Sequence, residues 1–277
     1  MSAEQLLKNG DITGALSALK QEIRANASDA KKRTFLFQLF AVTGDWQKAL
    51  DQLNVVGELD ALALPMVQSY RETIACEALR KEIFSGGRSP LIMGKPEEWV
   101  ALLTQSLALL SMQNVQQAES IRDKAFEGAP TTSGTINGQP FEWIADADSR
   151  LGPVLEVIVN GKYYWVPFNQ IQKIEIEAPT DLRDAVWLPG NFRWSSGGET
   201  VGFIPTRYVD SESSEDDAVK LSRKTVWEEL SPNTVIGRGQ RMLTTDEAEY
   251  AMLDVREIVF NLEPTTDDAA QAESTNG

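Results

Sequence analysis

The segment GDITGALSAL at positions 10–19 returns as GDWQKALDQL at positions 44–53. The two copies start 34 residues apart, at Gly10 and Gly44. A Gly-Asp pair ends one helix and caps the next. The alanine of each copy is small where two helices must approach closely, and the last leucine lies one turn further along the same face. The recurrence therefore predicts paired helices in the first half of the chain.

A period of 34 residues is that of the tetratricopeptide helical hairpin. Here the repeat is degenerate, because Phe37 stands where a small residue is usual and a third unit, which starts near Leu64, loses register at Ile83. We expect residues 1–128 to form an irregular, tetratricopeptide-like helical domain. Such arrays bind peptides or helices on a concave face. In the second unit that face would carry Lys31, Thr34, Gln38, Ala41 and Val42.

The pattern changes from helices to strands after a breaker-rich linker at positions 128–134. The clearest local signal is LEVIVNGKYYWV at 155–166, where Asn-Gly separates two runs of strand-forming residues. Asn-Gly in that setting predicts a tight hairpin, because its turn needs a positive φ twice. We expect residues 134–262 to form a small, mainly antiparallel β domain, which gives an α+β fold. Residues 263–277 lack a hydrophobic pattern and are expected to be a disordered acidic tail.

Composition argues against several classes of function. Among 277 residues, 26 are Lys or Arg and 41 are Asp or Glu, so the formal net charge is −15. Such a surface repels phosphate backbones and anionic lipids, and we expect neither nucleic acid nor membrane as a partner. The chain has no histidine and a single cysteine, Cys76, which excludes a Cys/His zinc cluster and a Ser-His-Asp triad. No secretory signal or apolar spanning segment is evident, so we expect a cytoplasmic protein without a cofactor.

Three polar clusters could still carry chemistry. The carboxylates of Asp146 and Asp148 could hold a divalent cation, as in a metal-dependent hydrolase, although the adjacent Arg150 favours a structural ion-pair network. Arg183 and Trp187 are typical of interface anchors, and an internal network explains them equally well. The stretch 237–241 lacks the Lys-Ser/Thr ending of a phosphate loop, and a turn between strands is the better interpretation.

The second half also contains a set of distinctive motifs. They are FEWIADADSRLGP (141–153), YWVPF (164–168), PTDLRD (179–184), PTRY (205–208), LSRKTVW (221–227) and GQR (239–241). These motifs resemble those of the ImpE family, also called TagJ, whose members are accessory proteins of bacterial type VI secretion. The resemblance covers most of the chain and is specific only in its second half. It implies binding to the N-terminal segment of the small subunit of the contractile sheath, and association with the AAA+ ATPase that disassembles contracted sheaths.

We therefore predict a non-enzymatic adaptor that binds one segment of a sheath subunit. Two surfaces compete for that segment, the concave helical face and the β domain, where aromatic and Arg residues are concentrated and a strand edge could be open. The β domain is slightly favoured because the specific motifs lie there. The candidate contact residues are Thr34, Gln38 and Val42 on the first surface, and Trp165, Arg183, Trp187, Arg207 and Tyr208 on the second.

Overall fold

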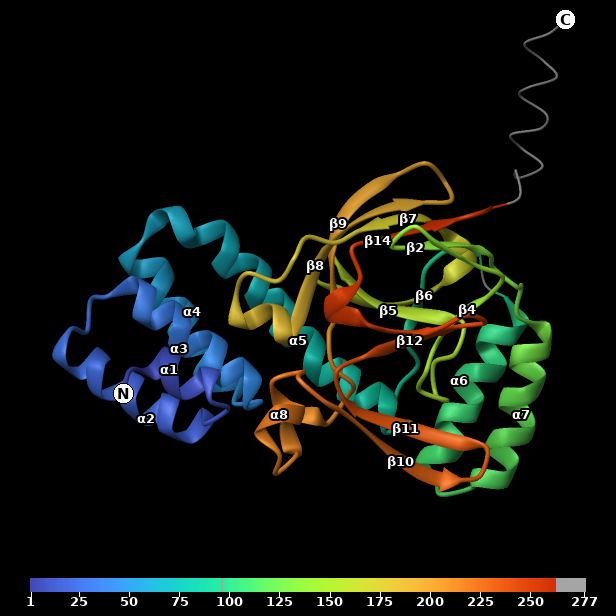
Figure 1. The fold of residues 1–277 in the computed structure, drawn as a ribbon, viewed down its shortest axis with the longest axis horizontal. Coiled ribbons are helices and arrows are strands. Elements are labelled where there is room, and N and C mark those ends of the chain that lie inside the picture. Colours follow the sequence, from blue (N-terminus) through green and yellow to red (C-terminus); the bar gives the residue numbers. More distant parts are fainter. Residues whose placement is uncertain (96, 263–277) are drawn as a thin grey trace, which may run out of the picture.

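The computed structural model describes residues 1–95 and 97–262, so the expected disordered tail lies outside the described residues. The chain begins with a helical array, which occupies the left of Figure 1, while the two helices within residues 98–128 lie on the right of that view and most strands of the β-sheets follow them in sequence. The helices are α1 (Ala3–Lys8), α2 (Ile12–Ala25), α3 (Ala30–Val42), α4 (Trp46–Leu59), α5 (Leu64–Phe84), α6 (Glu98–Ser111), α7 (Val115–Gly128) and the later α8 (Asp217–Lys220), with short 3-10 turns at η1 (Ala61–Ala63), η2 (Phe168–Gln170), η3 (Leu182–Ala185), η4 (Ser211–Ser213) and η5 (Met252–Asp254).

The two Gly-Asp copies mark the starts of α2 and α4, as the repeat predicts. Gly10 and Gly44 both adopt positive φ, at 86° and 72°, a region that residues with a side chain rarely enter. The Asp11 carboxylate accepts a hydrogen bond from the Gly14 N–H at 2.7 Å and so caps α2. Ala15 and Ala49 are fully buried, which confirms that these small residues lie where the helices touch.

The regular structure of the second half consists mainly of strands. They are β2 (Gly134–Ile136), β3 (Gln139–Phe141), β4 (Ile144–Asp146), β5 (Val154–Val159), β6 (Lys162–Pro167), β7 (Ile171–Glu175), β8 (Trp187–Trp194), β9 (Glu199–Pro205), β10 (Thr225–Ser231), β11 (Thr234–Gly239), β12 (Met242–Thr245), β13 (Glu249–Ala251) and β14 (Glu257–Phe260). A nine-stranded sheet has the order β1-β6-β5-β9-β8-β7-β14-β2-β3, and smaller sheets pair β10 with β11 and β13-β12-β4. The pairing is antiparallel except where β1 (Leu91–Ile92) joins β6. The α+β class is confirmed.

The predicted hairpin is β5–β6, closed between Val159 and Lys162. Its turn residues, Asn160 and Gly161, have φ of 50° and 69°, as the Asn-Gly pair requires. The parallel strand β1 was not expected. It comes from the connection between α5 and α6, so the helical half contributes one edge strand to the large sheet.

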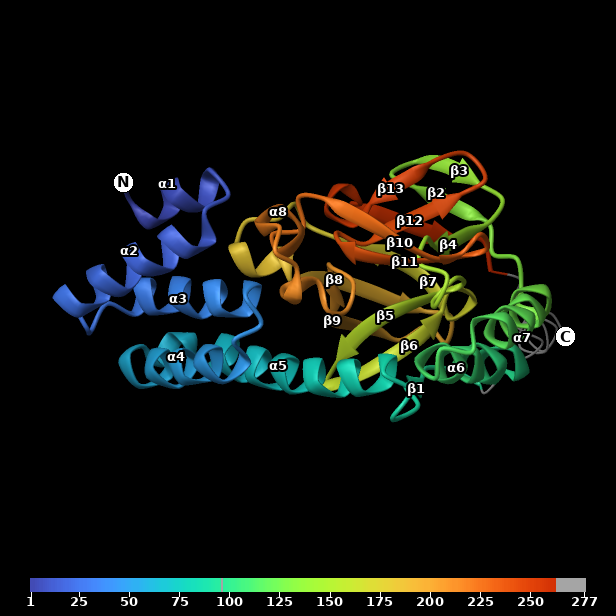
Figure 2. The same cartoon turned by 90° about the horizontal axis from the view of Figure 1, so that it is seen from below.

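Helix α5 connects the two halves. It leaves the helical array and runs along β5 and β6 (Figure 2). One hydrophobic core joins residues of the helices to Trp165, Trp187 and Tyr208 of the β half, and a second core lies within the β half around Ile174 and Ile258. The division into domains 1–128 and 134–262 stays a prediction, because this shared core crosses it.

Cys76 lies inside this shared core, as predicted for a small buried hydrophobe. Its side chain is 3% exposed, and the Sγ atom lies 3.4 Å from the carbonyl oxygen of Gly161. Burial raises the pKa of the thiol to about 12. The thiolate form is therefore scarce at neutral pH.

Candidate functional site

The most conspicuous polar feature is a buried charge network between α5 and the β half. At its centre is Glu156, which lies in the middle of β5, a strand with six buried residues. A carboxylate there needs ionic and hydrogen-bonding partners, because desolvating an unpaired charge is very unfavourable. Arg80 on α5 supplies two bonds, from Nε at 2.6 Å and Nη2 at 3.0 Å. Arg241 donates to the second oxygen, and the Tyr163 hydroxyl donates at 2.5 Å.

The network extends to the two carboxylates that the sequence singled out. Arg241 also pairs with Asp146, which accepts a further bond from the Tyr208 hydroxyl at 3.0 Å. Asp148 is held separately by Arg150, whose Nε and Nη2 donate at 2.9 and 2.6 Å. Guanidinium groups and backbone donors thus engage both carboxylates, which supports the ion-pair interpretation. No group of three or more metal-ligating side chains occurs among the described residues.

The guanidinium groups set the protonation of this network. Burial alone would raise the pKa of Glu156, but Arg80 and Arg241 outweigh it and hold that pKa at about 2. For Asp146 burial dominates and raises the pKa to about 6, against the opposing effect of Arg241. Glu156 is therefore ionised throughout the physiological range. The arrangement can orient and lock side chains, and it joins α5 to β5 by a bidentate pair.

Arg207 connects the second half to the helical array through bonds to backbone carbonyl oxygens and not to a carboxylate. Its guanidinium is 2% exposed and donates to the carbonyl oxygens of Val42 at 2.7 Å, Ala41 at 3.0 Å and Lys220 at 2.7 Å. Ala41 and Val42 end α3, where unpaired carbonyls and the helix dipole favour a cation. Burial lowers the pKa of Arg207. This residue of the predicted contact set therefore caps a helix.

The concave face predicted as a partner groove is filled by the chain itself. The η3 segment lies against α3, and Gln38 donates to Asp181 at 3.3 Å. Trp187 follows η3, and its ring centroid lies 5.8 Å from those of both Trp46 and Tyr70. Its Nε1 donates to Glu77 at 2.7 Å. We call residues 179–187 the groove segment. The expectation of a free groove is wrong, because this segment covers its apolar surface.

Burial also corrects the expectation that the candidate contact residues are exposed anchors. Only Thr34 and Arg183 keep appreciable exposure: Thr34 is partly exposed, and the side chain of Arg183, which stacks over the Tyr70 ring, is 22% exposed. Aromatic and Arg residues are common both at interfaces and in polar cores, so their local density did not distinguish the two. The buried members, at 5% exposure or less, are Gln38, Val42, Trp165, Trp187, Arg207 and Tyr208.

Trp227 on β10 is an accessible aromatic residue outside the predicted contact set, as are Trp143 and Phe126. Trp227 is 39% exposed, and its neighbours Val226 and Leu230 are 40% and 38% exposed. The sequence signal for this residue is the motif at 221–227, which indicates the family but not an exposed surface. Strands β10 and β11 form a two-stranded ribbon. A cleft of about 440 Å³ lies beside this ribbon and is lined by Ala147, Trp227, Glu229, Val235 and Glu249.

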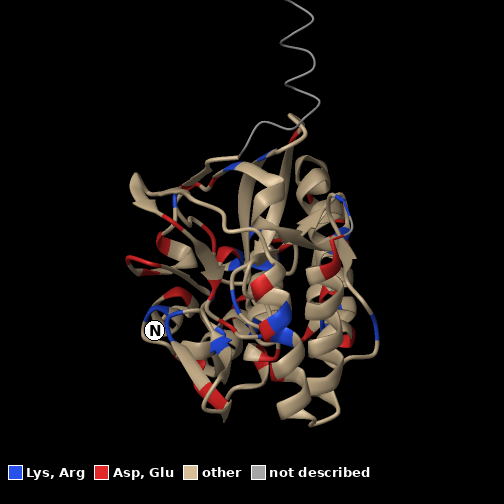
Figure 3. Cartoon of the chain, turned by 90° about the vertical axis from the view of Figure 1, so that its right-hand side faces the viewer, with Lys and Arg blue, Asp and Glu red and all other residues tan. Residues whose placement is uncertain are grey.

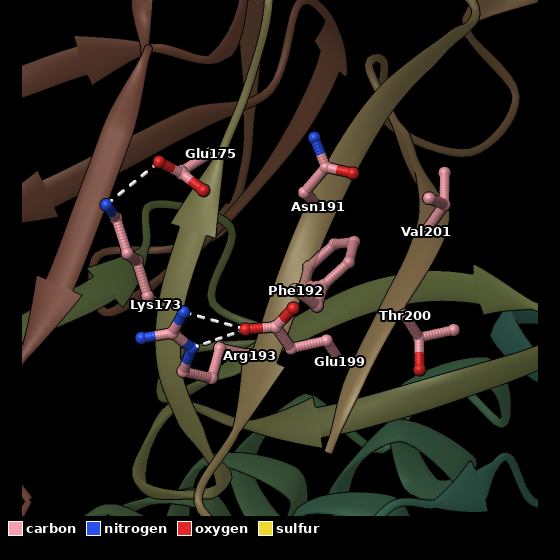
Figure 4. Close-up of a pocket in the computed structure, with 8 residues that line it drawn as sticks. All are labelled: Lys173, Glu175, Asn191, Phe192, Arg193, Glu199, Thr200 and Val201. Atoms are coloured by element: carbon pink, nitrogen blue, oxygen red, sulfur yellow. Dashed lines mark hydrogen bonds and ion pairs between the residues drawn. The ribbon is translucent and has the colours of Figure 1, made fainter. Parts of the chain in front are cut away.

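Two other clefts have less distinctive chemistry. One of about 330 Å³ lies on β7, β8 and β9 (Figure 4), where Lys173 pairs with Glu175 at 2.9 Å and Arg193 with Glu199 at 2.7 Å. These paired charges are typical of a solvated sheet face. The other, of about 370 Å³, lies between the Gly86–Ser89 turn and α6.

Comparison with known proteins places this architecture in a family. A family model described as "ImpE protein" matches residues 138–259. The type VI secretion system accessory component TagJ of Pseudomonas aeruginosa is 49% identical over 265 residues, covering 96% of this chain and 92% of that protein. The chain belongs to the ImpE/TagJ family. A crystal structure of protein VPA1032 from Vibrio parahaemolyticus is similar at a TM-score of 0.85 and 28% identity, covering 94% of this chain and 98% of the other.

The ImpE region contains most of the buried network. Asp146, Asp148, Glu156, Arg207 and Arg241 all lie inside residues 138–259. The α5 partners of the network, Glu77 and Arg80, lie outside that region and come from the helical half. In the described part of the chain, the helices are too short or too polar to cross a membrane.

Proposed function

We propose that this chain is a non-enzymatic adaptor of type VI secretion that binds the N-terminal segment of the sheath small subunit. The observation that carries the proposal is 49% identity, over 96% of the chain, to a protein named as an accessory component of that system. The sheath segment itself comes from the family resemblance. An adaptor function also suits a site whose carboxylates are engaged in ion pairs rather than open to a substrate.

We further propose that the protein acts in the cytoplasm and brings the sheath-disassembling AAA+ ATPase to the sheath. Acidic positions lie on both helices and loops (Figure 3), and the formal charge of −15 favours basic protein surfaces over nucleic acid or anionic lipid. Of the predicted contact residues, Thr34 and Arg183 would still be available to a partner at the rim of the helical array.

The test is a titration of a labelled peptide, the N-terminal segment of the sheath small subunit from the same bacterium, with the full-length chain. We expect saturable binding, and no binding of a scrambled peptide with the same composition. Fluorescence anisotropy measures both. Absence of saturable binding of the native segment would overturn the sheath proposal. Loss of affinity in Arg183→Ala would place the binding surface at the rim of the helical array. Unchanged affinity would remove Arg183 from the contact set.

The proposal that the protein is not an enzyme has a separate test. Calorimetric titration with Mg²⁺, Mn²⁺ and Ca²⁺ should give no saturable heat, because Arg241 and Arg150 occupy the oxygens of Asp146 and Asp148. Saturable heat that disappears in Asp148→Asn would instead favour a metal-dependent hydrolase at these carboxylates.

A further inference from the structure

We propose that the free edge of β10 and the cleft beside it form a docking site for an extended protein segment in which basic and apolar residues alternate. The cleft, here called the Trp227 cleft, is lined by Ala147, Trp227, Glu229, Val235 and Glu249 and has a volume of about 440 Å³. The inference does not rest on the sheath proposal, because it follows from the chemistry of this surface alone.

The backbone of β10 is open on the side away from β11. The Gln240 N–H donates to the Lys224 carbonyl, so in the alternating antiparallel ladder Val226 and Glu228 bond to β11, while Trp227 and Glu229 direct their N–H and C=O groups outward. Among the described residues, β11 is the only strand that pairs with β10. β10 forms the lower edge of this ribbon in Figure 1. An unpaired edge of this kind accepts an added strand.

On the opposite edge of the ribbon, formed by β11, the outward backbone groups have hydrogen-bond partners within the chain. On β11 the outward N–H of Gly237 donates to Asp148 at 2.9 Å, and that of Gly239 donates to Ser211 at 2.7 Å. The Val235 N–H donates to the Ser149 hydroxyl, and the Val235 carbonyl accepts from the Ser149 N–H, both at 3.0 Å. The chain thus closes one edge of the ribbon with its own residues and leaves the other open.

The side chains around the open edge suit a cation with an apolar stem. Part of the Trp227 ring packs on Tyr208 at a centroid distance of 5.7 Å, and 39% of the residue remains exposed. Glu229 and Glu249 lie beside it and are exposed, and within the described residues neither has an ion-pair partner. Glu228, on the other face of the ribbon, pairs with Arg238. A Lys or Arg side chain can place its stem on the indole and its charge between the two carboxylates.

The alternation of a strand defines the rest of the segment. Side chains that point to the same face as Trp227 and Glu229 enter the cleft, and we expect these to be basic. The others lie beside Val226 and Leu230, which are exposed, and we expect these to be apolar. The same carboxylates disfavour edge-to-edge pairing of two copies of this chain, because Glu228 and Glu229 of each would meet.

The probe is a fluorescein-labelled ten-residue peptide of alternating Lys and Val, titrated with the full-length chain and followed by anisotropy. A peptide of alternating Glu and Val is the control for charge. We expect saturable binding of the Lys peptide only. The double variant Glu229→Gln with Glu249→Gln should weaken it by about tenfold or more, which corresponds to about 1.4 kcal/mol, because the Lys side chain loses its charge-assisted contacts. Glu247→Gln, which removes one carboxylate outside the cleft lining, should bind like the parent.

Strand addition is tested separately with N-methylated peptides. Methyl groups on alternate backbone nitrogens of the Lys peptide remove the donors on one edge. One methylated set should lose binding and the complementary set should keep it, because only one edge of the segment faces β10. Retained binding by both sets, equal weakening in the double variant and in Glu247→Gln, or no binding of the Lys peptide would each overturn the proposal. The sheath segment, titrated against the same double variant, reports on the adaptor proposal independently.

Discussion

At the scale of single residues, the protein concentrates charge where water is absent. Arg241 and Glu156 are both fully buried, and Arg80 is 2% exposed. A buried ion pair adds little net stability over a well-packed apolar pair, but removal of one member leaves a buried charge without a partner. The network therefore specifies which side chains meet.

Arg241→Met tests this interpretation, since it leaves Asp146 and Glu156 without a shared cation. We expect a loss of about 3–5 kcal/mol in the free energy of unfolding, measured by urea denaturation. Arg238→Met, in the exposed pair with Glu228, is the matched control and should cost less than about 1 kcal/mol. Equal losses in the two variants would contradict the shared pairing of Arg241 with Asp146 and Glu156.

The pKa of Glu156 predicts a dependence on pH. Its folded-state pKa of about 2 lies below the ordinary value of 4.5, so its stabilisation is complete above pH 4.5 and is lost as the pH falls through 2. The variant Glu156→Gln should be less stable than the parent at pH 7, on the order of 3 kcal/mol for a shift of this size. This difference should shrink between pH 4.5 and 2. A difference that stays constant over that range would show that the carboxylate charge is not responsible.

At the scale of elements, the groove segment is a short stretch held by many partners. Asp184 is buried and accepts backbone bonds from Thr180 and Asp181, both at 2.8 Å, which form the turn before Trp187. The segment thus enters the helical array as a preformed turn, and its aromatic end packs between Trp46 and Tyr70.

Asp184→Ala should loosen this turn. Two backbone N–H groups lose their acceptor, and we expect a loss of about 1–3 kcal/mol in unfolding free energy. Trypsin should then cleave after Arg183 faster than in the parent, which mass spectrometry of short digests detects. The exposed Glu177→Ala is the control. Cleavage at the parental rate in Asp184→Ala would mean that other contacts hold the segment.

At the scale of the whole molecule, the shared core predicts a single unfolding transition. The helical half contributes far-ultraviolet circular dichroism, while most tryptophans, including Trp165 and Trp187, lie in the β half. Because both halves bury residues in one core, the two signals should change at the same urea concentration. Separate midpoints would show that residues 1–128 and 134–262 unfold as independent domains.

Much of the architecture follows from local sequence. The Gly-Asp copies predicted the starts of α2 and α4, because a glycine at positive φ acts within a few residues. Of the two expected carboxylate caps, Asp11 makes its hydrogen bond at α2, whereas the Asp45 side chain makes none at α4. Asn160 and Gly161 predicted the β5–β6 hairpin for the same reason. The motifs of the second half were sufficient to indicate the family, and Arg150 beside Asp148 indicated an ion pair of neighbours.

The partners and the exposure of the key residues were decided only by the tertiary structure. Arg241 meets Asp146 across 95 residues of chain, and Trp187 meets Glu77 across 110. Local periodicity shows which side of an element is apolar but not which segment covers it, so a groove filled by residues 179–187 and an open groove have the same pattern. For the same reason Trp165 and Trp227 look alike in sequence. The fold buries the first inside the core and leaves the second on a free strand edge, because only the first has another layer packed over it.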